Sequence, residues 1–487
     1  MSARWTRVAL ASLAALTLGC ATVPPCPAKG GPAWTELSTR HFVIRTDLAA
    51  ADASELARQL EESRAVLLTL AWPNAADPPG RWDVVAFASQ RELSPFVADQ
   101  VGGSWRSAPP FPPTISLGGV DSFAGTGTVA HEMAHELSRQ FLPIQPPWFA
   151  EGLATFFETS TYDRSARIAH AGMPPASRVA GLQQFGRLRA RELIEAAREP
   201  EGGPELGRFE NSCWLLFHDL VAKHATGLAR FQDLVRRLVE WPAAWKQAFP
   251  DLSYEGLDDE LDDYFAGGRF GGISRGVDVS VGKIDRRTLR DAEVHDLRAS
   301  LFATGGARDV QRARAEVAEA LAQDPDDVDA VAVSRYFLGG ATPDDERLAA
   351  LARGGHGMRW LAATMMVDAQ RPPPPAARAT LLSAMIATPD EPEILTRVAA
   401  LDANAGRWDQ ALALSERALH LGGGRNLALL VAYAYALAHV GQCPEALFMR
   451  DVLTREPAPE RFTGVVGDVG KLCGRSPSNA AAPRPSP

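Results

Sequence analysis

The sequence predicts an α+β protein that is mostly helical, with a small mixed sheet near the N-terminus and an all-helical second half. Between residues 33 and 122, short apolar runs alternate with one segment of helical periodicity. From about residue 125 the patterns are helical, and beyond about residue 290 the chain is rich in Ala and Leu with short Asp, Pro and Gly breaks. A length of 487 residues leaves room for about two to four domains.

The charge balance restricts the class of partner. Fifty basic and fifty-nine acidic side chains give a net charge of −9. The sequence therefore lacks the basic footprint of a nucleic-acid-binding protein and an N-terminal polybasic tract for anionic lipid. A mean hydropathy of −0.12 excludes a polytopic membrane protein, and five cysteines are too few for a disulfide scaffold.

Residues 1–20, MSARWTRVALASLAALTLGC, have the pattern of a bacterial export signal. Arg4 and Arg7 precede an apolar run that is too short to span a bilayer. The run ends at Leu-Gly-Cys and resembles a lipoprotein signal, in which Cys20 would carry the lipid anchor and become the mature N-terminus. An ordinary cleaved signal with Cys20 incidental is the alternative. Either way we expect the mature protein to be exported to the bacterial cell envelope.

Export would place the other cysteines in an oxidising compartment, where pairing is possible. Cys443 and Cys473 lie thirty positions apart in the C-terminal region and are the expected pair. Cys213 lies in the apolar run SCWLLF and is expected to be a buried free thiol.

The first half predicts alternating elements. We expect a helix over 53–71 and a loop over the Pro-rich segment 108–113. The expected strands cover residues 42–45, 82–88 and 114–117. The expected helices cover residues 125–141, 147–158, 180–198, 207–225 and 227–239, with Thr126 or Thr128 as N-cap of the first. Glycines at 267, 268, 271 and 272 form a candidate hinge or boundary.

The second half contains a weak internal repeat. Gly406-Arg-Trp-Asp-Gln-Ala-Leu412 recurs thirty-five residues later as Gly441-Gln-Cys-Pro-Glu-Ala-Leu447. The glycine would allow a tight turn between helices, and the alanine would let paired helices approach closely. The spacing resembles the tetratricopeptide repeat. A generic bundle of helical hairpins is the alternative.

The sequence His-Glu-Met-Ala-His at residues 131–135 indicates a zinc site. On a helix, His131 and His135 share a face and can offer two imidazole nitrogens to one Zn²⁺ ion. Glu132 lies about 100° around the helix, where a carboxylate could take the proton of a water molecule. Glu151, in Trp148-Phe-Ala-Glu-Gly-Leu-Ala154, would be the third ligand and would leave one position open for water.

These motifs resemble the gluzincin-type, MA-like zinc peptidases of bacterial envelopes. The resemblance covers about residues 33–265 and implies a zincin-like fold, Zn²⁺ bound by His131, His135 and Glu151, and Glu132 as general base and then acid. It also implies an edge strand for an extended substrate, for which Thr114–Gly119 is the candidate. The expected organisation is a signal over 1–20, a linker over 21–32, a peptidase domain over 33–270, a repeat-like helical domain over 290–475 and a disordered tail over 476–487.

One residue departs from the family pattern. Many relatives carry a Tyr that could hydrogen-bond the oxyanion, whereas the matching run here begins with Phe209, which has no hydroxyl group. Losing one such donor typically costs about 10²–10³ in rate. The substitute donors that remain open are Tyr162, His170 and His218.

Three further residues near the motifs have open roles. Glu158 could orient a metal ligand or be solvated, and Glu136 is expected to be exposed or to support a ligand. His218 and His224 are about 240° apart on one helix, so they would not face one metal together and are expected to be surface or packing residues.

The sequence therefore supports an exported zinc metallopeptidase that acts on a peptide or protein substrate. Its repeat-like domain would hold a protein partner, and a lipid at Cys20 would hold it to a membrane. The first alternative is a metal-binding but inactive lipoprotein scaffold, which the substitution at Phe209 favours. The second is an interaction protein without metal.

Overall fold

The computed structural model describes residues 23, 25–97, 103–108, 110–119, 127–200, 202–306, 308–354, 358, 360–369, 375–422, 426–455 and 459–474. The expected export signal, Cys20 and the expected tail at 476–487 lie outside these residues. Within the described ranges, none of the helices combines the length and the apolar character needed to cross a bilayer.

A six-stranded mixed sheet forms the centre of the first half. Its middle strands β2, β3 and β5 are parallel, and the outer strands pair antiparallel with them or with each other. The strands, in their order across the sheet, are β4 (Gly103–Ala108), β5 (Phe111–Gly118), β3 (Trp82–Phe87), β2 (Phe42–Thr46), β1 (Thr35–Ser38) and β9 (Asp285–Thr288). The three strands that the apolar runs predict are therefore confirmed as β2, β3 and β5.

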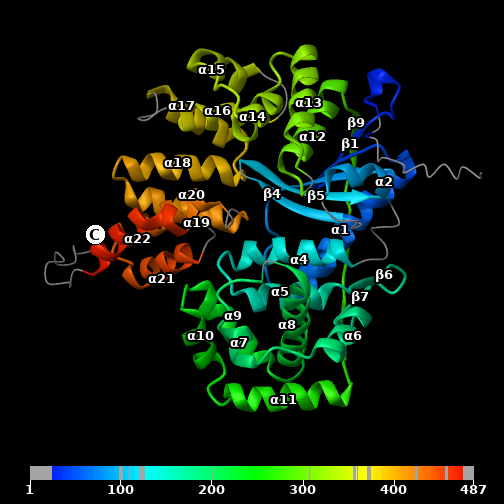
Figure 1. Ribbon diagram of the computed structural model, residues 1–487, viewed down its shortest axis with the longest axis vertical. Coiled ribbons are helices and arrows are strands. Elements are labelled where there is room, and N and C mark those ends of the chain that lie inside the picture. Colours follow the sequence, from blue (N-terminus) through cyan, green and yellow to red (C-terminus); the bar gives the residue numbers. More distant parts are fainter. Residues whose placement is uncertain are drawn as a thin grey trace, which may run out of the picture.

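Helices cover both faces of this sheet (Figure 1). On one face, alternate residues such as Ile44 and Val84 pack against α1 (Ala50–Ala71) and α4 (Thr128–Phe141). On the other face, Val85 and Phe87 belong to a second core with α12 (Asp291–Thr304). Period-two alternation thus gives the central strands two apolar contacts, which explains their near-continuous hydrophobic sequences.

The helices below the sheet in Figure 1 enclose α8, whose central residues are buried. The helices of this region are α5 (Pro147–Phe157), α6 (Ala176–Phe185), α7 (Ala190–Ile194), α8 (Gly203–Lys223), α9 (Ala225–Arg236), α10 (Trp241–Ala248) and α11 (Tyr254–Gly267). The short helix α2 (Gln90–Leu93) follows β3. The single helix expected over 180–198 is wrong. Two helices occupy this region because α6 ends at Gly186, whose φ of 67° is a backbone conformation that favours glycine and does not continue a helix.

Two local expectations are corrected near α4. The segment 108–113 is not wholly a loop, because Phe111, Pro112 and Pro113 begin β5. The prolines cannot donate to a ladder, and the pairing with β4 is irregular opposite them while the β3 ladder starts only at Thr114. The N-cap of α4 is Gly127 rather than Thr128, and Thr126 lies outside the described residues.

The glycines at 267–272 do not end the first half's sheets. After them, β8 (Ile273–Gly276) pairs with β7 (Ile168–Ala171), which also pairs with β6 (Thr161–Asp163). The next strand, β9, pairs with β1 at the edge of the main sheet. Both strands are short and mostly polar, which is why hydrophobic periodicity does not reveal them.

The second half is a stack of helical hairpins (Figure 1). Gly406 and Gly441 have φ values of 73° and 86°, and the alanines that follow them, Ala411 and Ala446, are fully buried. Both glycines therefore have the positive φ that favours glycine in a turn, and both alanines lie in the core. The helices after α12 are α13 (Val310–Gln323), α14 (Val328–Phe337), α15 (Asp345–Gly354), α16 (Trp360–Ala369), α17 (Pro375–Ala387), α18 (Pro392–Asn404), α19 (Trp408–His420), α20 (Leu427–His439), α21 (Cys443–Thr454) and α22 (Thr463–Cys473).

The two halves meet beside α4. The imidazole Nδ1 of His420, at the end of α19, lies 3.1 Å from the carbonyl oxygen of Gln140 near the end of α4. Glu136, one turn earlier on α4, lies against Gly422. The helix that carries the HExxH motif is thus in direct contact with the helical half.

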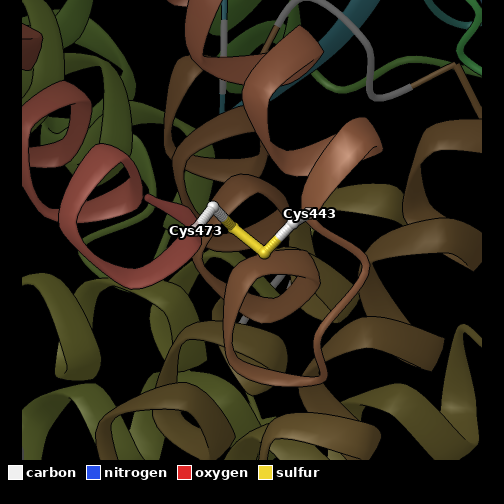
Figure 2. The surroundings of a disulfide bond; sticks show 2 residues. All are labelled: Cys443 and Cys473. Atoms are coloured by element: carbon white, nitrogen blue, oxygen red, sulfur yellow. A yellow bond between two sulfur atoms is a disulfide. The ribbon is translucent and has the colours of Figure 1, made fainter. Parts of the chain in front are cut away.

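A disulfide joins Cys443 at the start of α21 to Cys473 at the end of α22, with 5.3 Å between the Cα atoms (Figure 2). The pairing expected from the sequence is confirmed. Cys213 is a buried free thiol, also as expected. The bond ties the last helix of the chain back onto the hairpin before it.

Reduction of this disulfide should destabilise the helical half, because the bond limits the unfolded chain by closing a thirty-residue loop. The loop-closure entropy corresponds to about 3–4 kcal/mol of the free energy of unfolding. Urea unfolding with and without dithiothreitol measures this difference. In the Cys443→Ser/Cys473→Ser double variant, dithiothreitol should have no further effect; an equal effect in that variant would exclude the disulfide as the cause.

Candidate metal site

The candidate metal ligands come from two adjacent helices. His131 and His135 lie one turn apart on α4, so both imidazoles leave the helix on the same side. Glu151 lies on α5, which begins with Pro147 at its first position, where proline's missing N–H has no helical partner to lose. The structure thus brings together the three residues that the sequence pattern selects.

The three donor groups converge at distances that suit a metal ion. His135 Nε2 lies 3.0 Å from His131 Nε2 and 3.1 Å from Glu151 Oε1, and His131 Nε2 lies 3.7 Å from Glu151 Oε2. In a tetrahedral site with bonds of 2.0–2.1 Å, neighbouring ligand atoms are about 3.4 Å apart. The group therefore could hold a metal ion through two imidazole nitrogens and one carboxylate oxygen.

Close packing of α5 on α8 places Glu151. The residue after it is Gly152, where a Cβ atom would lie 2.7 Å from Phe217 Cβ and 2.9 Å from the carbonyl oxygen of Cys213. Only glycine allows this approach without a shift of α5. Around it, Trp148 and Phe149 are buried in a cluster of aromatic rings. Glu151 is therefore the candidate ligand, and the neighbouring Gly152 allows the close helix contact that holds Glu151 in place.

A carboxylate fixes the first imidazole. Glu158 Oε1 lies 3.0 Å from His131 Nδ1, so this nitrogen is engaged and Nε2 faces the other donors. Of the two roles left open for Glu158 by the sequence, the structure selects the orienting one. Such carboxylate–imidazole contacts raise the basicity of a ligand and hold its ring.

An arginine extends this contact into a chain of charges. Arg178 on α6 donates from Nε to Glu158 Oε2 at 3.2 Å, and its other nitrogens bond Glu158 and Glu210 of α8. Sequence reasoning missed Arg178 and Glu210. Neither residue lies in a motif, and their role depends on the packing of α6 against α8.

The burial of this cluster shifts its pKa values. Burial acts to lower the pKa of His131, but its hydrogen bond to Glu158 and the charges of Glu151 and Glu132 outweigh this effect and raise the pKa. Burial raises the pKa of Glu151. Burial also acts to raise the pKa of Glu158, but its hydrogen bonds with His131 and Arg178 lower it overall. Glu158 is therefore the carboxylate that stays ionised beside the imidazole.

Glu132 occupies the position expected for a proton acceptor. It follows His131 on α4 and is half-buried. Within the part of the chain that the structure describes, its carboxylate makes no hydrogen bond and no ion pair. The group is therefore available to a water molecule or a substrate.

The residues considered as oxyanion donors are engaged elsewhere. Phe209 is buried in the core at 2% exposure. Tyr162 donates to the carbonyl oxygen of Val277, and His170 Nδ1 bonds the hydroxyl of Ser274. His218 is a buried packing residue, as expected, and contacts the Gly172 carbonyl and the Tyr264 hydroxyl.

Glu136 is buried, at 4% exposure, and pairs with Arg139, so of its two expected positions the exposed one is excluded. The expectation for the edge strand is wrong. The segment Thr114–Gly119 is not an edge strand, because β5 lies between β3 and β4. The edge strand is β4, which is antiparallel to β5 and contacts α4. Its mixed Gly, Ser and Arg sequence has no hydrophobic pattern that identifies a strand.

A lysine lies within another cluster of possible metal ligands, at the end of α8. Asp219, His224 and Glu260 lie close together, but the ammonium group of Lys223 is 2.7 Å from Asp219 Oδ1 and 3.0 Å from Glu260 Oε1. The lysine thus supplies the cation that balances these carboxylates. His224 bonds Glu260 and is a surface-side packing residue.

Comparison with known proteins adds no family to this site. No family model matches the chain, and no curated protein matches it in sequence. The chemistry of the site therefore follows from its own donor atoms, distances and charges.

Proposed function

We propose that the protein is an exported zinc metallopeptidase of the gluzincin type. The observation that carries the proposal is the convergence of His131, His135 and Glu151, with an unpaired carboxylate, Glu132, on the same helix within the described residues. Two nitrogen donors and one oxygen donor suit Zn²⁺, and three protein ligands are typical of catalytic rather than structural zinc sites. When bound, Zn²⁺ would act as a Lewis acid toward water and the substrate carbonyl.

In the proposed hydrolysis, different residues of the chain have different roles. Glu132 accepts a proton from the attacking water and returns it to the leaving amine. Glu158 and Arg178 keep the imidazole of His131 in one orientation. A peptide can extend the main sheet by pairing with β4, whose outer edge has no partner strand among the described residues.

The sequence of elements also supports a zincin-like fold. An antiparallel edge strand, a parallel strand, the HExxH helix and the glutamate helix follow one another as β4, β5, α4 and α5. In the second half, the turns at Gly406 and Gly441 and the buried Ala411 and Ala446 support tetratricopeptide-like hairpins. We place a protein partner on this half, and membrane attachment through a lipid at Cys20.

The buried Phe209 favours a second candidate, a metal-binding scaffold without activity. Phe209 supplies no hydroxyl group, and the three alternative donors bond other groups. Digestion of a peptide library, with and without a chelator, separates the two candidates. Chelator-sensitive cleavage supports the peptidase; metal binding without any cleavage supports the scaffold; absence of bound metal excludes both.

Glu132→Gln should abolish hydrolysis and leave metal binding intact, because the amide cannot accept a proton and the residue is not a ligand. The expected loss in kcat is about 10²–10⁴-fold. The measurements are cleavage of a substrate from the library and metal content by mass spectrometry. Glu205→Gln, an exposed change on α8, is the matched control. Full activity in Glu132→Gln would contradict the mechanism.

Glu158→Gln should weaken metal binding by about 10–100-fold, because the contact that orients His131 loses its charge. Competition with a chromogenic chelator measures the dissociation constant. Arg178→Gln should have a smaller effect, since the bond between Glu158 and His131 remains. Equal affinities for wild type and Glu158→Gln would show that this contact does not support the metal.

Metal affinity should fall as the pH falls through the raised pKa of His131. Below that pKa the metal must displace the proton on His131. The affinity should then fall about tenfold for each pH unit, because one proton is released on binding. Above it the affinity should be level. In Glu158→Gln the decline should begin at a lower pH, because the bond that raises the pKa is lost. Identical profiles for both proteins would contradict this assignment.

A further inference from the structure

A second group of metal-binding side chains lies far from α4, where the N-terminal segment meets α12. Donor atoms of Cys26, Asp291 and His295 all lie within 4.8 Å of one another. Cys26 and His295 are 2% and 4% exposed. Sulfur, imidazole and carboxylate are the three donor types that Zn²⁺ uses in proteins.

A tight turn holds the cysteine in place. The carbonyl oxygen of Cys26 accepts hydrogen bonds from the backbone of Lys29 and Gly31, and Pro27 and a left-handed Gly30 complete the turn. The segment is also fastened to α12, because Ala28 N donates to Asp291 Oδ1 at 2.8 Å. The hydrogen-bonded turn therefore fixes the position of the Cys26 thiol in the cluster.

The imidazole is oriented like that of a metal ligand. His295 Nδ1 lies 2.5 Å from Glu316 Oε2 on α13, so a carboxylate fixes one side of the ring. On the other side, the buried Nε2 has no hydrogen-bond partner among the described residues, and Asp291 Oδ2 lies 3.3 Å away. An imidazole that binds zinc through one nitrogen usually bonds a carboxylate or another acceptor through its other nitrogen.

The distance between the imidazole and the carboxylate also suits a divalent cation. The 3.3 Å between His295 Nε2 and Asp291 Oδ2 matches the edge of about 3.4 Å expected for a tetrahedral site. The sulfur lies 3.5 Å from Nδ1, and one donor atom from each of the three residues lies within 4.8 Å of the other two. Arg298 donates to the sulfur at 3.0 Å, which leaves sulfur lone pairs for a metal.

We propose that Cys26, Asp291 and His295 form a second metal site, which takes Zn²⁺ or a similar thiophilic divalent ion. On binding, Cys26 releases its proton to solvent and the ion joins the N-terminal segment to α12. Glu316 orients the imidazole from outside the ligand set. The role of the site is structural, and it does not depend on the proposed peptidase activity.

Cobalt substitution tests this site directly, because a thiolate–Co²⁺ bond gives a near-ultraviolet charge-transfer band that a His/His/Glu site cannot give. The full chain is stripped with a chelator, loaded with Co²⁺ and, in parallel, with Zn²⁺. We expect the band in the wild type and two zinc equivalents per chain. Cys26→Ser and His295→Gln should each lose the band and one zinc equivalent. Circular dichroism checks the folding of each variant.

Two controls separate this site from the one on α4. His135→Ala should lose one zinc equivalent and keep the band, and Cys213→Ser should change neither, since its buried thiol lies on α8. Absence of the band in wild type overturns the proposal without any variant. A band that persists in Cys26→Ser also overturns it. Neither result bears on the equivalent that depends on His135, so failure of the second site and failure of the proposed function are distinguishable.

Discussion

The geometry of the candidate site depends on how closely α5 can approach α8. Gly152 removes the one Cβ atom that would collide with Phe217 and with the Cys213 carbonyl, and Glu151 is its neighbour. With α5 at this distance, a carboxylate from one helix reaches two imidazoles on another, and Glu158 at the end of α5 reaches the outer nitrogen of His131. Packing of apolar helices thus determines the placement of polar ligands.

Local sequence patterns predict those features of this protein that depend on residues close together in the chain. Helical spacing placed His131 and His135 on one face, and apolar runs identified the three central strands of the sheet. The disulfide and the glycine turns of the second half were also predictable, because cysteine pairing in a confined region and tight helix turns each have a direct chemical reason. The long-range neighbours of Glu151 were expected only by resemblance to a family.

The features that the sequence did not predict depend on residues far apart in the chain. Arg178 acquires its role only when α6 packs against α8 and its guanidinium group reaches both Glu158 and Glu210. The edge strand β4 has no hydrophobic alternation, and its identity follows from pairing with β5. Cys26 and His295 are 269 positions apart, and no spacing rule relates them. These contacts form only in the folded protein, and neither hydrophobic periodicity nor secondary-structure propensity can predict them.

The position of β9 has a consequence for how the chain can be divided. A truncated chain that ends at the glycine-rich segment would keep the HExxH and glutamate helices but lose β9, and β1 would become an uncovered edge. Open edges of this kind invite pairing between copies and aggregation. Only two residues separate β9 from α12, so the last strand of the first half and the first helix of the second are nearly continuous. An isolated first half should therefore extend at least through residue 288.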